Sequence, residues 1–261
     1  MFKNMISMAF GCIAKIKFPK SIQVFINKKY VEHFGIDMSN FRDVSEYDNL
    51  LSLFTRQFVN TPQIEEGFVS PCDGVVFGMG VSESVDNKCK AFSIKGKDYF
   101  IDDVLIKKPF EAFDFVNIYL SPKDYHNYHA PCDMQILSLS YIPADLYSVN
   151  YKTLLKVPNL YAKNERVILE CKSGEKVFFM VFVGALNVGK MVFDFDKSVQ
   201  TNAKKGACYK EYDELYVKKG EMLGRFELGS TILIFSKHKD IDYKISENDK
   251  LYFGKQIASD I

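Results

Sequence analysis

Several features that define common classes of protein are absent from this chain of 261 residues. The net charge is only +1, so no overall charge attracts the chain to nucleic acid. No run of 18 apolar residues occurs, so we expect no segment that spans a bilayer. The six cysteines form no Cys-x-x-Cys pair, which argues against a zinc site and favours free thiols in a reducing cytosol.

The first thirty residues hold six lysines and no acidic residue. Their apolar side chains recur at the spacing of one helix face, at Phe2, Ile6, Ala9, Ile13 and Ile16. A basic helix with one apolar face binds in the interface of an anionic membrane. The alternative is a docking helix whose lysines are solvated. A secretory signal peptide is disfavoured, because no small-x-small cleavage site follows the apolar run.

The hydrophobic pattern changes near residue 60. Before it, apolar residues in "SIQVFINKKYVEHFGI" and "NLLSLFTRQF" recur at helical spacing. From Phe68 onward, short alternating runs are separated by Gly, Pro, Asp and Asn, as between strands, and "KSGEK" at 172–176 predicts a hairpin loop. The pattern predicts an α+β fold, with a helical N-terminal segment over residues 1–60 and a β-rich core over residues 61–261.

One stretch near the end of the chain, "FELGSTILIF" at 226–235, has the composition of a strand but holds Gly229-Ser230 in its middle. Glycine weakens a strand interior and often marks a bulge or a close backbone approach. The hydroxyl of Ser230 has the carbonyl of Gly229 close at hand. The Gly-x-Ser-x-Gly turn of many serine hydrolases does not occur, so a different serine chemistry is required.

Two further stretches contain side chains suited to proton transfer. In "VSPCDG", Asp73 is predicted at a strand-to-turn corner, where it either caps the turn or orients a base. In "SPKDYHNYHAP", His126 and His129 would share a face of a helical turn, although two ligands do not make a metal site. Histidine is the usual proton carrier near neutral pH, so this pair is a candidate for acid–base chemistry.

In combination, these stretches resemble the phosphatidylserine decarboxylase family in its prokaryotic, membrane-associated form. The matching pieces are "VSPCDG", "SPKDYHNYHAP", "IPADLYSVN", "NERVI", "VGALNVGKM" and "KKGEMLGRFELGSTILIF", which occur in the family's order between residues 67 and 236. The helical N-terminus is similar to the family's membrane-contacting segment. Together with the strand pattern, the resemblance implies that the helical segment packs on an antiparallel, sandwich-like core.

The resemblance implies that the chain is a proenzyme that cuts itself between Gly229 and Ser230. Ser230 Oγ would attack the Gly229 carbonyl and convert the amide into an ester, which glycine favours because it tolerates the distorted backbone. His129 matches the family's general base, and Asp73 matches the carboxylate that orients it in a charge relay. β-Elimination would then break the ester, and the new N-terminal residue would lose ammonia to leave a pyruvoyl group built from Ser230.

The pyruvoyl group is the cofactor that the resemblance implies, and no metal is expected. Its ketone would form a Schiff base with the amine of phosphatidylserine and accept the electrons left when carbon dioxide departs, giving phosphatidylethanolamine for phospholipid biosynthesis. His126 matches a family position linked to decarboxylation, in substrate positioning or proton transfer. The resemblance also implies a peripheral enzyme on the cytoplasmic face of the cell membrane, made of a large and a small chain, with a possible homodimer.

Two positions depart from the family's pattern. Cys72 stands where the family often has Ala, and Asn127 stands where it often has Arg, so Lys123 or Arg225 would have to contact the lipid headgroup. Two rival functions remain open. One is the same chemistry on another serine-headgroup lipid of the archaetidylserine type. The other is a non-catalytic β module that resembles a lipoyl carrier and would not cut itself.

Overall fold

The computed structural model describes residues 13–94, 97–149, 151–185, 190–199, 201, 206–227 and 230–259, with the backbone alone described at 92–94, 97, 151 and 230. Strands outnumber helices in these ranges, and the predicted α+β fold with a β-rich core is confirmed. The helical elements are α2 (Lys20–Phe34), η1 (Val44–Glu46), α3 (Leu50–Phe54), α4 (Ile101–Leu105), α5 (Tyr151–Leu154) and α6 (Leu160–Lys163).

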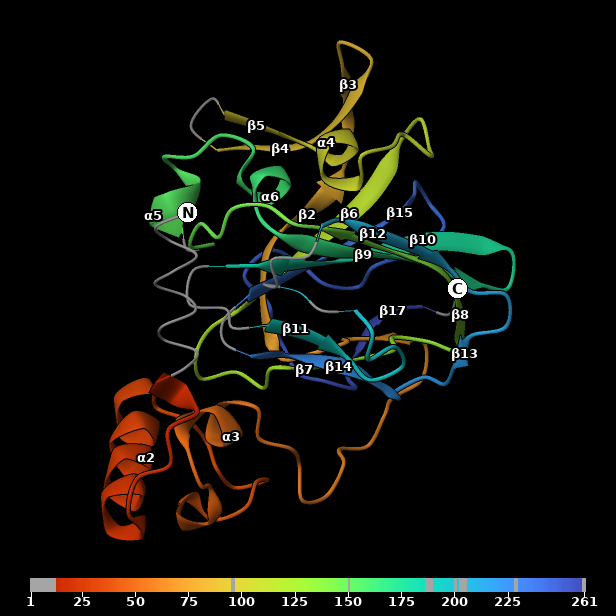
Figure 1. Ribbon diagram of the computed structural model, residues 1–261. Helices are drawn as coiled ribbons and strands as arrows, with labels where there is room; N and C mark the ends of the chain where they lie inside the picture. The colour runs from red at the N-terminus through yellow and green to blue at the C-terminus, as the bar shows by residue number, and fades with distance from the viewer. Residues whose placement is uncertain are drawn as a thin grey trace.

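A large antiparallel sheet forms the middle layer of the molecule (Figure 1). One of its central strands, β10 (Lys176–Gly184), is almost wholly apolar, as expected for a strand covered on both faces. The strand order is β12 (Cys208–Glu211), β8 (Met134–Ile142), β9 (Arg166–Ser173), β10 (Lys176–Gly184), β15 (Ser230–Lys237), β6 (Phe113–Leu120), β2 (Gly74–Val81) and β16 (Lys250–Leu251), with β13 (Tyr216–Val217) also paired to β8. The predicted hairpin loop "KSGEK" is confirmed between β9 and β10.

Smaller sheets cover this layer. On one face lie β11 (Lys190–Phe193), β14 (Met222–Glu227) and β7 (Asn127–His129), and the rings of Tyr128, Phe182 and Phe226 pack between the two sheets. On the other face lie β3 (Glu83–Val85), β4 (Lys88–Ile94) and β5 (Lys97–Phe100), together with α4 and α6 (Figure 1). A short pair, β1 (Phe68–Val69) with β17 (Gln256–Ala258), completes the pairing. The layers form the sandwich-like core that was expected.

The reading of 226–235 as one strand is wrong. Its residues belong to β14 and β15, which lie in different sheets, and residues 228–229 between them are outside the described ranges. Phe226 and Ile232 are both buried in the core between the two sheets. The apolar composition is therefore explained by a chain that passes from one layer to the other, and not by one continuous strand.

The N-terminal helices pack at one end of the core, and α2 is unusual in what it exposes (Figure 1). Its buried side chains are polar: Asn27 Nδ2 donates to the carbonyl oxygens of Val44 (3.3 Å) and Tyr47 (2.9 Å). Two of its apolar side chains are exposed, Ile22 at 48% and Phe25 at 62%. The helix ends at Gly35, whose positive φ caps it as predicted.

Two further findings concern membrane spans and cysteines in the described part of the chain. None of its helices has both the length and the apolar character needed to cross a membrane. The five cysteines within these ranges, Cys72, Cys89, Cys132, Cys171 and Cys208, are free thiols. The predicted helix over the first residues lies outside the described part of the chain up to residue 12.

Candidate active site

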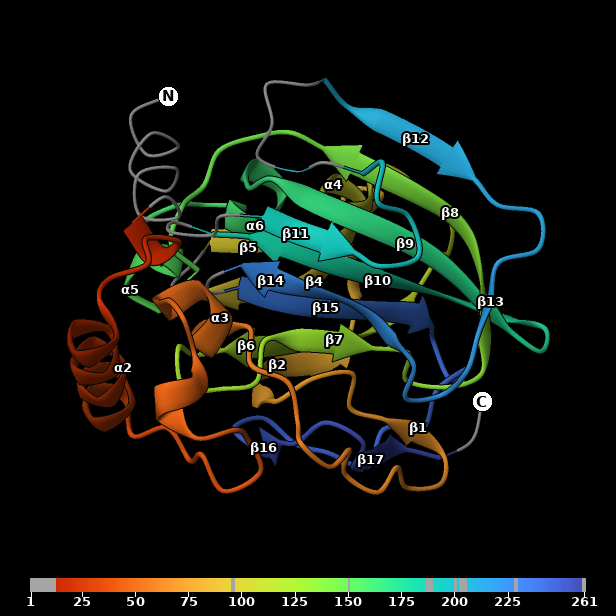
Figure 2. The same ribbon diagram turned by 60° about the horizontal axis from the view of Figure 1, so that its bottom comes forward.

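Several strands of the large sheet begin or end along one edge of the sheet, an edge made of strand ends and not of an outermost strand. The register places Ser230, the first residue of β15, between Leu120 at the end of β6 and Gly184 at the end of β10. Gly74 begins β2, the next strand beyond β6 (Figure 2). Asp73 precedes Gly74, and the histidine segment, residues 121–129, follows Leu120. The antiparallel topology therefore brings the three predicted stretches to the same edge of the sheet.

The histidine segment also runs beside the strand that leads to the predicted cleavage bond. In the pairing of β7 with β14, His129 lies opposite Met222 and Asn127 opposite Arg225. The Phe226 N–H donates to the His126 carbonyl at 3.0 Å. Along this register His126 lies beside the C-terminal end of β14, and His129 lies beside its N-terminal end. Asn127–His129 form β7, so the shared face of a helical turn does not form, and no cluster of three possible metal ligands occurs among the described residues.

His126 is completely buried. Its Nδ1 lies 2.8 Å from the Asp124 carbonyl oxygen, which can only accept, so the ring proton sits on Nδ1. Its ring packs on Phe54 from α3, with 4.0 Å between the ring centroids. The bare Nε2 has no hydrogen-bond partner within the described structure. Burial lowers the pKa of His126 to about 3, so the ring is neutral at physiological pH.

His129 has the same tautomer but a different surrounding. Its Nδ1 donates to the Gly220 carbonyl at 2.9 Å, and its Nε2 accepts the hydroxyl proton of Tyr125 at 3.0 Å. The ring is stacked on Phe253 with 3.7 Å between centroids. Burial lowers the pKa of His129 to about 4. His129 is therefore a neutral base whose accepting nitrogen is already engaged by a tyrosine.

Asp73 lies at the corner between β1 and β2, as predicted. Its Oδ1 accepts the N–H of Phe253 at 2.8 Å, while the ring of the same Phe253 stacks on His129. Burial raises the pKa of Asp73 to about 6. Within the described part of the chain no hydrogen bond joins Asp73 to His129, so the charge relay remains a prediction. Phe253, which contacts both residues, keeps them in one neighbourhood.

A cleft of about 310 Å³ opens beside Asp73. Arg56, Lys123 and Asp124 also line it, with aromatic residues that include Phe41, Phe58 and Phe253. Lys123 is exposed there, whereas Arg225, the other residue expected at the headgroup, lies 3.4 Å from Asp194. Of these two residues, the structure places Lys123 beside the predicted site and gives Arg225 an ion-pair partner.

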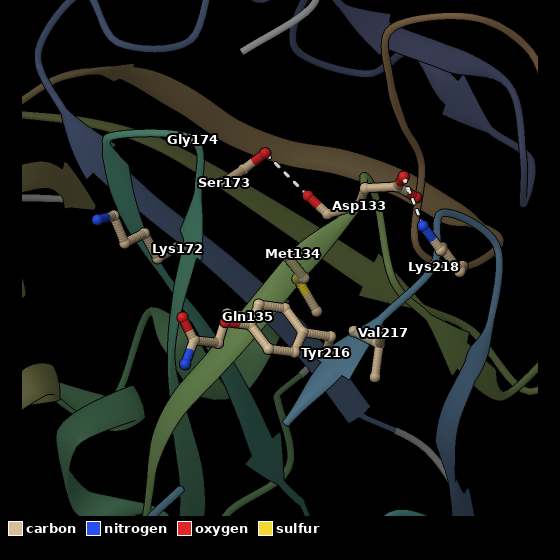
Figure 3. A pocket seen from close by; sticks show the side chains of 9 residues that line it. All are labelled: Asp133, Met134, Gln135, Lys172, Ser173, Gly174, Tyr216, Val217 and Lys218. Carbon is tan, nitrogen blue, oxygen red and sulfur yellow. Dashed lines mark hydrogen bonds and ion pairs between the residues drawn. The ribbon is translucent and has the colours of Figure 1, made fainter. Parts of the chain in front are cut away.

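A second cleft, of about 360 Å³, is lined by residues at the start of β8 and the end of β9 (Figure 3). In the strand register these residues lie at the opposite end from Ser230. It contains an ion pair of 3.4 Å between Lys218 and Asp133, and Ser173 Oγ donates to the Asp133 carbonyl at 2.8 Å. None of the residues predicted to do chemistry lines this cleft. Its Lys218 and Asp133 pair with each other. The first cleft, beside Asp73, is therefore the better candidate for the active site.

Sequence reasoning missed several residues that surround the histidines: Phe54, Arg56, Tyr125, Gly220 and Phe253. Tyr125 lay inside a motif that was already singled out. Arg56 carried a weak signal, since it is a lone charge in the apolar run "LSLFTRQF". Gly220 and Phe253 act through backbone groups and ring stacking across long sequence separations, which no local pattern reveals.

Comparison with known proteins identifies the family of the chain. The sequence profile described as "Phosphatidylserine decarboxylase" matches residues 50–259, most of the chain. The chain belongs to the phosphatidylserine decarboxylase family. The family match includes α3 and Arg56 as well as the whole β core, so the contacts between them lie inside the part of the chain shared with the family.

Individual relatives extend the similarity over nearly the whole chain. A protein of Campylobacter jejuni named phosphatidylserine decarboxylase proenzyme is 48% identical over 264 residues, covering 98% of this chain and 99% of that protein. A Helicobacter pylori protein of the same name is 42% identical and covers 98% of this chain and 96% of its own length. A protein of the same name from Nitrosospira multiformis is 32% identical and covers 98% of this chain and 93% of its own length.

Proposed function

We propose that this chain is a phosphatidylserine decarboxylase that matures by cutting itself between Gly229 and Ser230. The observation that carries the proposal is the combination of a family match over residues 50–259 with a shared sheet edge for Asp73, the histidine segment and Ser230. The relatives are named proenzymes, which supports a chain that is processed before it acts.

Self-cleavage assigns a role to three side chains. Ser230 Oγ attacks the carbonyl carbon of Gly229 and gives its proton to His129. His129 then passes that proton to the amide nitrogen, which leaves as the amine of Ser230 while the ester forms. His129 suits this role because its Nδ1 proton is fixed on the Gly220 carbonyl, which leaves Nε2 as the accepting atom. Asp73, ionised above about pH 6, stabilises the positive charge that develops on the imidazole.

The decarboxylation step needs an electron sink, which a pyruvoyl group built from Ser230 would supply. The surroundings of Ser230 fit such a group. Ser230 starts β15 beside Leu120, and the segment after Leu120 carries the buried, unpartnered Nε2 of His126. A bare imidazole nitrogen in an apolar setting can accept a proton from a substrate amine or return one to the carbon that loses carbon dioxide. We assign that proton transfer to His126.

The N-terminal segment is proposed to hold the enzyme at a membrane surface, on the cytoplasmic face. Five apolar side chains there are exposed, Ile13, Ile16, Phe18, Ile22 and Phe25, among lysines that attract anionic lipid.

Replacing both Ile22 and Phe25 by Ser should weaken binding to anionic vesicles by about tenfold or more. The control is Val81→Ser, which alters an exposed apolar residue of the core. Equal vesicle binding by both variants would contradict membrane contact through α2.

Activity on defined lipids tests the proposed function. Purified full-length protein in detergent is supplied with phosphatidylserine, and both phosphatidylethanolamine and carbon dioxide are measured. A serine-headgroup lipid with an archaeal core is run in parallel. Turnover of phosphatidylserine with equal release of both products supports the proposal. Turnover of the archaeal-type lipid alone reassigns the substrate, and no turnover of either lipid by a self-cleaved chain contradicts it.

A further inference from the structure

Arg56, which follows α3 in the N-terminal segment, is buried against the histidine segment, with only 3% of its surface exposed. Its Nη2 donates to the carbonyl oxygens of Lys123, at 2.6 Å, and Asp124, at 3.2 Å. Its own carbonyl oxygen accepts a hydrogen bond from Asn127 Nδ2 at 2.9 Å. One residue outside the β core is thus bonded to three residues of the histidine segment.

The burial of this guanidinium is costly. In the described ranges Asp73 and Asp124 act on its charge without a direct ion pair, and its Nε and Nη1 have no hydrogen-bond partner. The Phe41 ring covers its face, with 4.7 Å from Cζ to the ring centroid. A buried charge with so few partners destabilises a fold. Such departures from ordinary packing are expected mainly at functional positions.

The contacts of Arg56 converge on His126. The Asp124 carbonyl oxygen accepts from both Arg56 Nη2 and His126 Nδ1. Two residues before Arg56, the Phe54 ring packs on the face of the His126 imidazole. The carbonyl fixes the ring proton on Nδ1, and Phe54 fixes the plane of the ring. The unprotonated Nε2 therefore points in one fixed direction. Phe54 of the N-terminal segment and the Asp124 carbonyl, which Arg56 of that segment binds, set this direction.

We propose that Arg56 is a positioning residue for decarboxylation, which holds the Asp124 carbonyl that sets the tautomer and orientation of His126. The assignment of that step to His126 rests on the proposed function. Arg56 itself is not proposed to touch the substrate. Loss of its two hydrogen bonds would free the Asp124 carbonyl to rotate and allow the imidazole proton to move to Nε2, where it would block the accepting lone pair.

The test compares Arg56→Met with Arg42→Met in the full-length protein. Arg42 is matched because it also lies over an aromatic ring, 5.7 Å from the Tyr47 centroid, yet is exposed. Self-cleavage is measured by chain mass, and kcat and KM are measured on detergent-dispersed phosphatidylserine. The chain has only four histidines, so ¹⁵N-histidine labelling reads the His126 tautomer directly, with His126→Ala identifying its signals.

We expect Arg56→Met to cut itself, to lose about tenfold or more in kcat with little change in KM, and to show a proton on Nε2 of His126. Arg42→Met should match the wild type. Wild-type kcat, or an unchanged His126 tautomer in Arg56→Met, would overturn the proposal. If the methionine variant does not fold, Arg56→Lys provides the test, since lysine keeps the positive charge but lacks the planar guanidinium group. A reduced kcat of this variant supports the proposal, and a wild-type kcat overturns it.

The tautomer measurement separates this proposal from the proposed function. A wild-type protein that fails to decarboxylate phosphatidylserine would refute the proposed activity, whatever the state of His126. An imidazole that carries its proton on Nε2 in the wild type would refute the positioning role, even in a fully active enzyme. The two failures therefore give different results.

Discussion

His126 and His129 stand three residues apart and share a tautomer, yet their accepting nitrogens differ. Each donates its Nδ1 proton to a backbone carbonyl, and burial lowers the pKa of each imidazole. Nε2 of His126 has no partner in the described structure, whereas Nε2 of His129 accepts from Tyr125. The comparison teaches that two like bases are distinguished by their neighbours. His126 is ready to accept a proton, and His129 must first exchange Tyr125 for another donor.

The largest effect that would follow from this difference is on maturation. His129→Ala removes the proposed base for Ser230, and we expect self-cleavage to slow by about a thousandfold, so that the purified protein stays uncut. The chain masses after prolonged incubation report the result. A His129→Ala protein that cuts itself at the wild-type rate would assign the base elsewhere.

His126→Ala should have the opposite profile. The variant should mature normally, because His129 and Ser230 are intact, while kcat for decarboxylation falls by about a hundredfold. Self-cleavage and turnover are measured on the same preparation. If His126→Ala blocks maturation as completely as His129→Ala does, the two histidines do not have separate roles.

Asp73→Asn should slow maturation by about tenfold, since the amide cannot balance the charge of a protonated His129 and a charge interaction without a direct hydrogen bond is worth about 1.4 kcal/mol. The pH dependence sharpens this prediction. Burial raises the pKa of Asp73 to about 6, so the carboxylate is protonated below that pH and ionised above it. Wild-type maturation should accelerate as pH rises through about 6. The rate for Asp73→Asn should stay flat in that range, and a wild-type rate independent of pH would contradict the role.

Tyr125→Phe should have the smallest effect, in the opposite direction. It removes the hydrogen bond that occupies His129 Nε2, which is worth about 1 kcal/mol. Maturation should therefore speed up by about fivefold, and thermal unfolding should occur at slightly lower temperature. Both are measured on freshly refolded or newly synthesised chain. Slower maturation would instead mean that Tyr125 takes part in the proton transfer.

Much of the fold could be predicted from the sequence because its signals are local. Alternation and turn residues revealed the β core, and Gly35 marked the end of α2. The single strand over 226–235 was a wrong prediction, since a run that crosses between two layers has the same apolar composition as one that stays in a sheet. Strand order was beyond reach, because it depends on contacts between distant parts of the chain.

The candidate site was predictable only in part. Asp73, His126, His129 and Ser230 were predicted through a family resemblance, and their roles remain predictions. The register brings the stretches that contain them to one edge of the sheet. The partners that give the histidines different properties could not be predicted. Tyr125 and Gly220 each form one hydrogen bond with His129, and Arg56 donates two, to the carbonyl oxygens of Lys123 and Asp124. These hydrogen bonds exist only in the folded chain.

We propose that Ser230 cuts the chain before it and becomes the pyruvoyl cofactor of the enzyme. Intact mass spectrometry of the purified wild type is the direct test. Ser230→Ala is the control. The account predicts two chains from the wild type, residues 1–229 and residues 230–261, with the second bearing a ketone in place of its terminal amine, and one uncut chain from the variant. A wild-type preparation that has full decarboxylase activity but contains only the uncut 261-residue chain would contradict it.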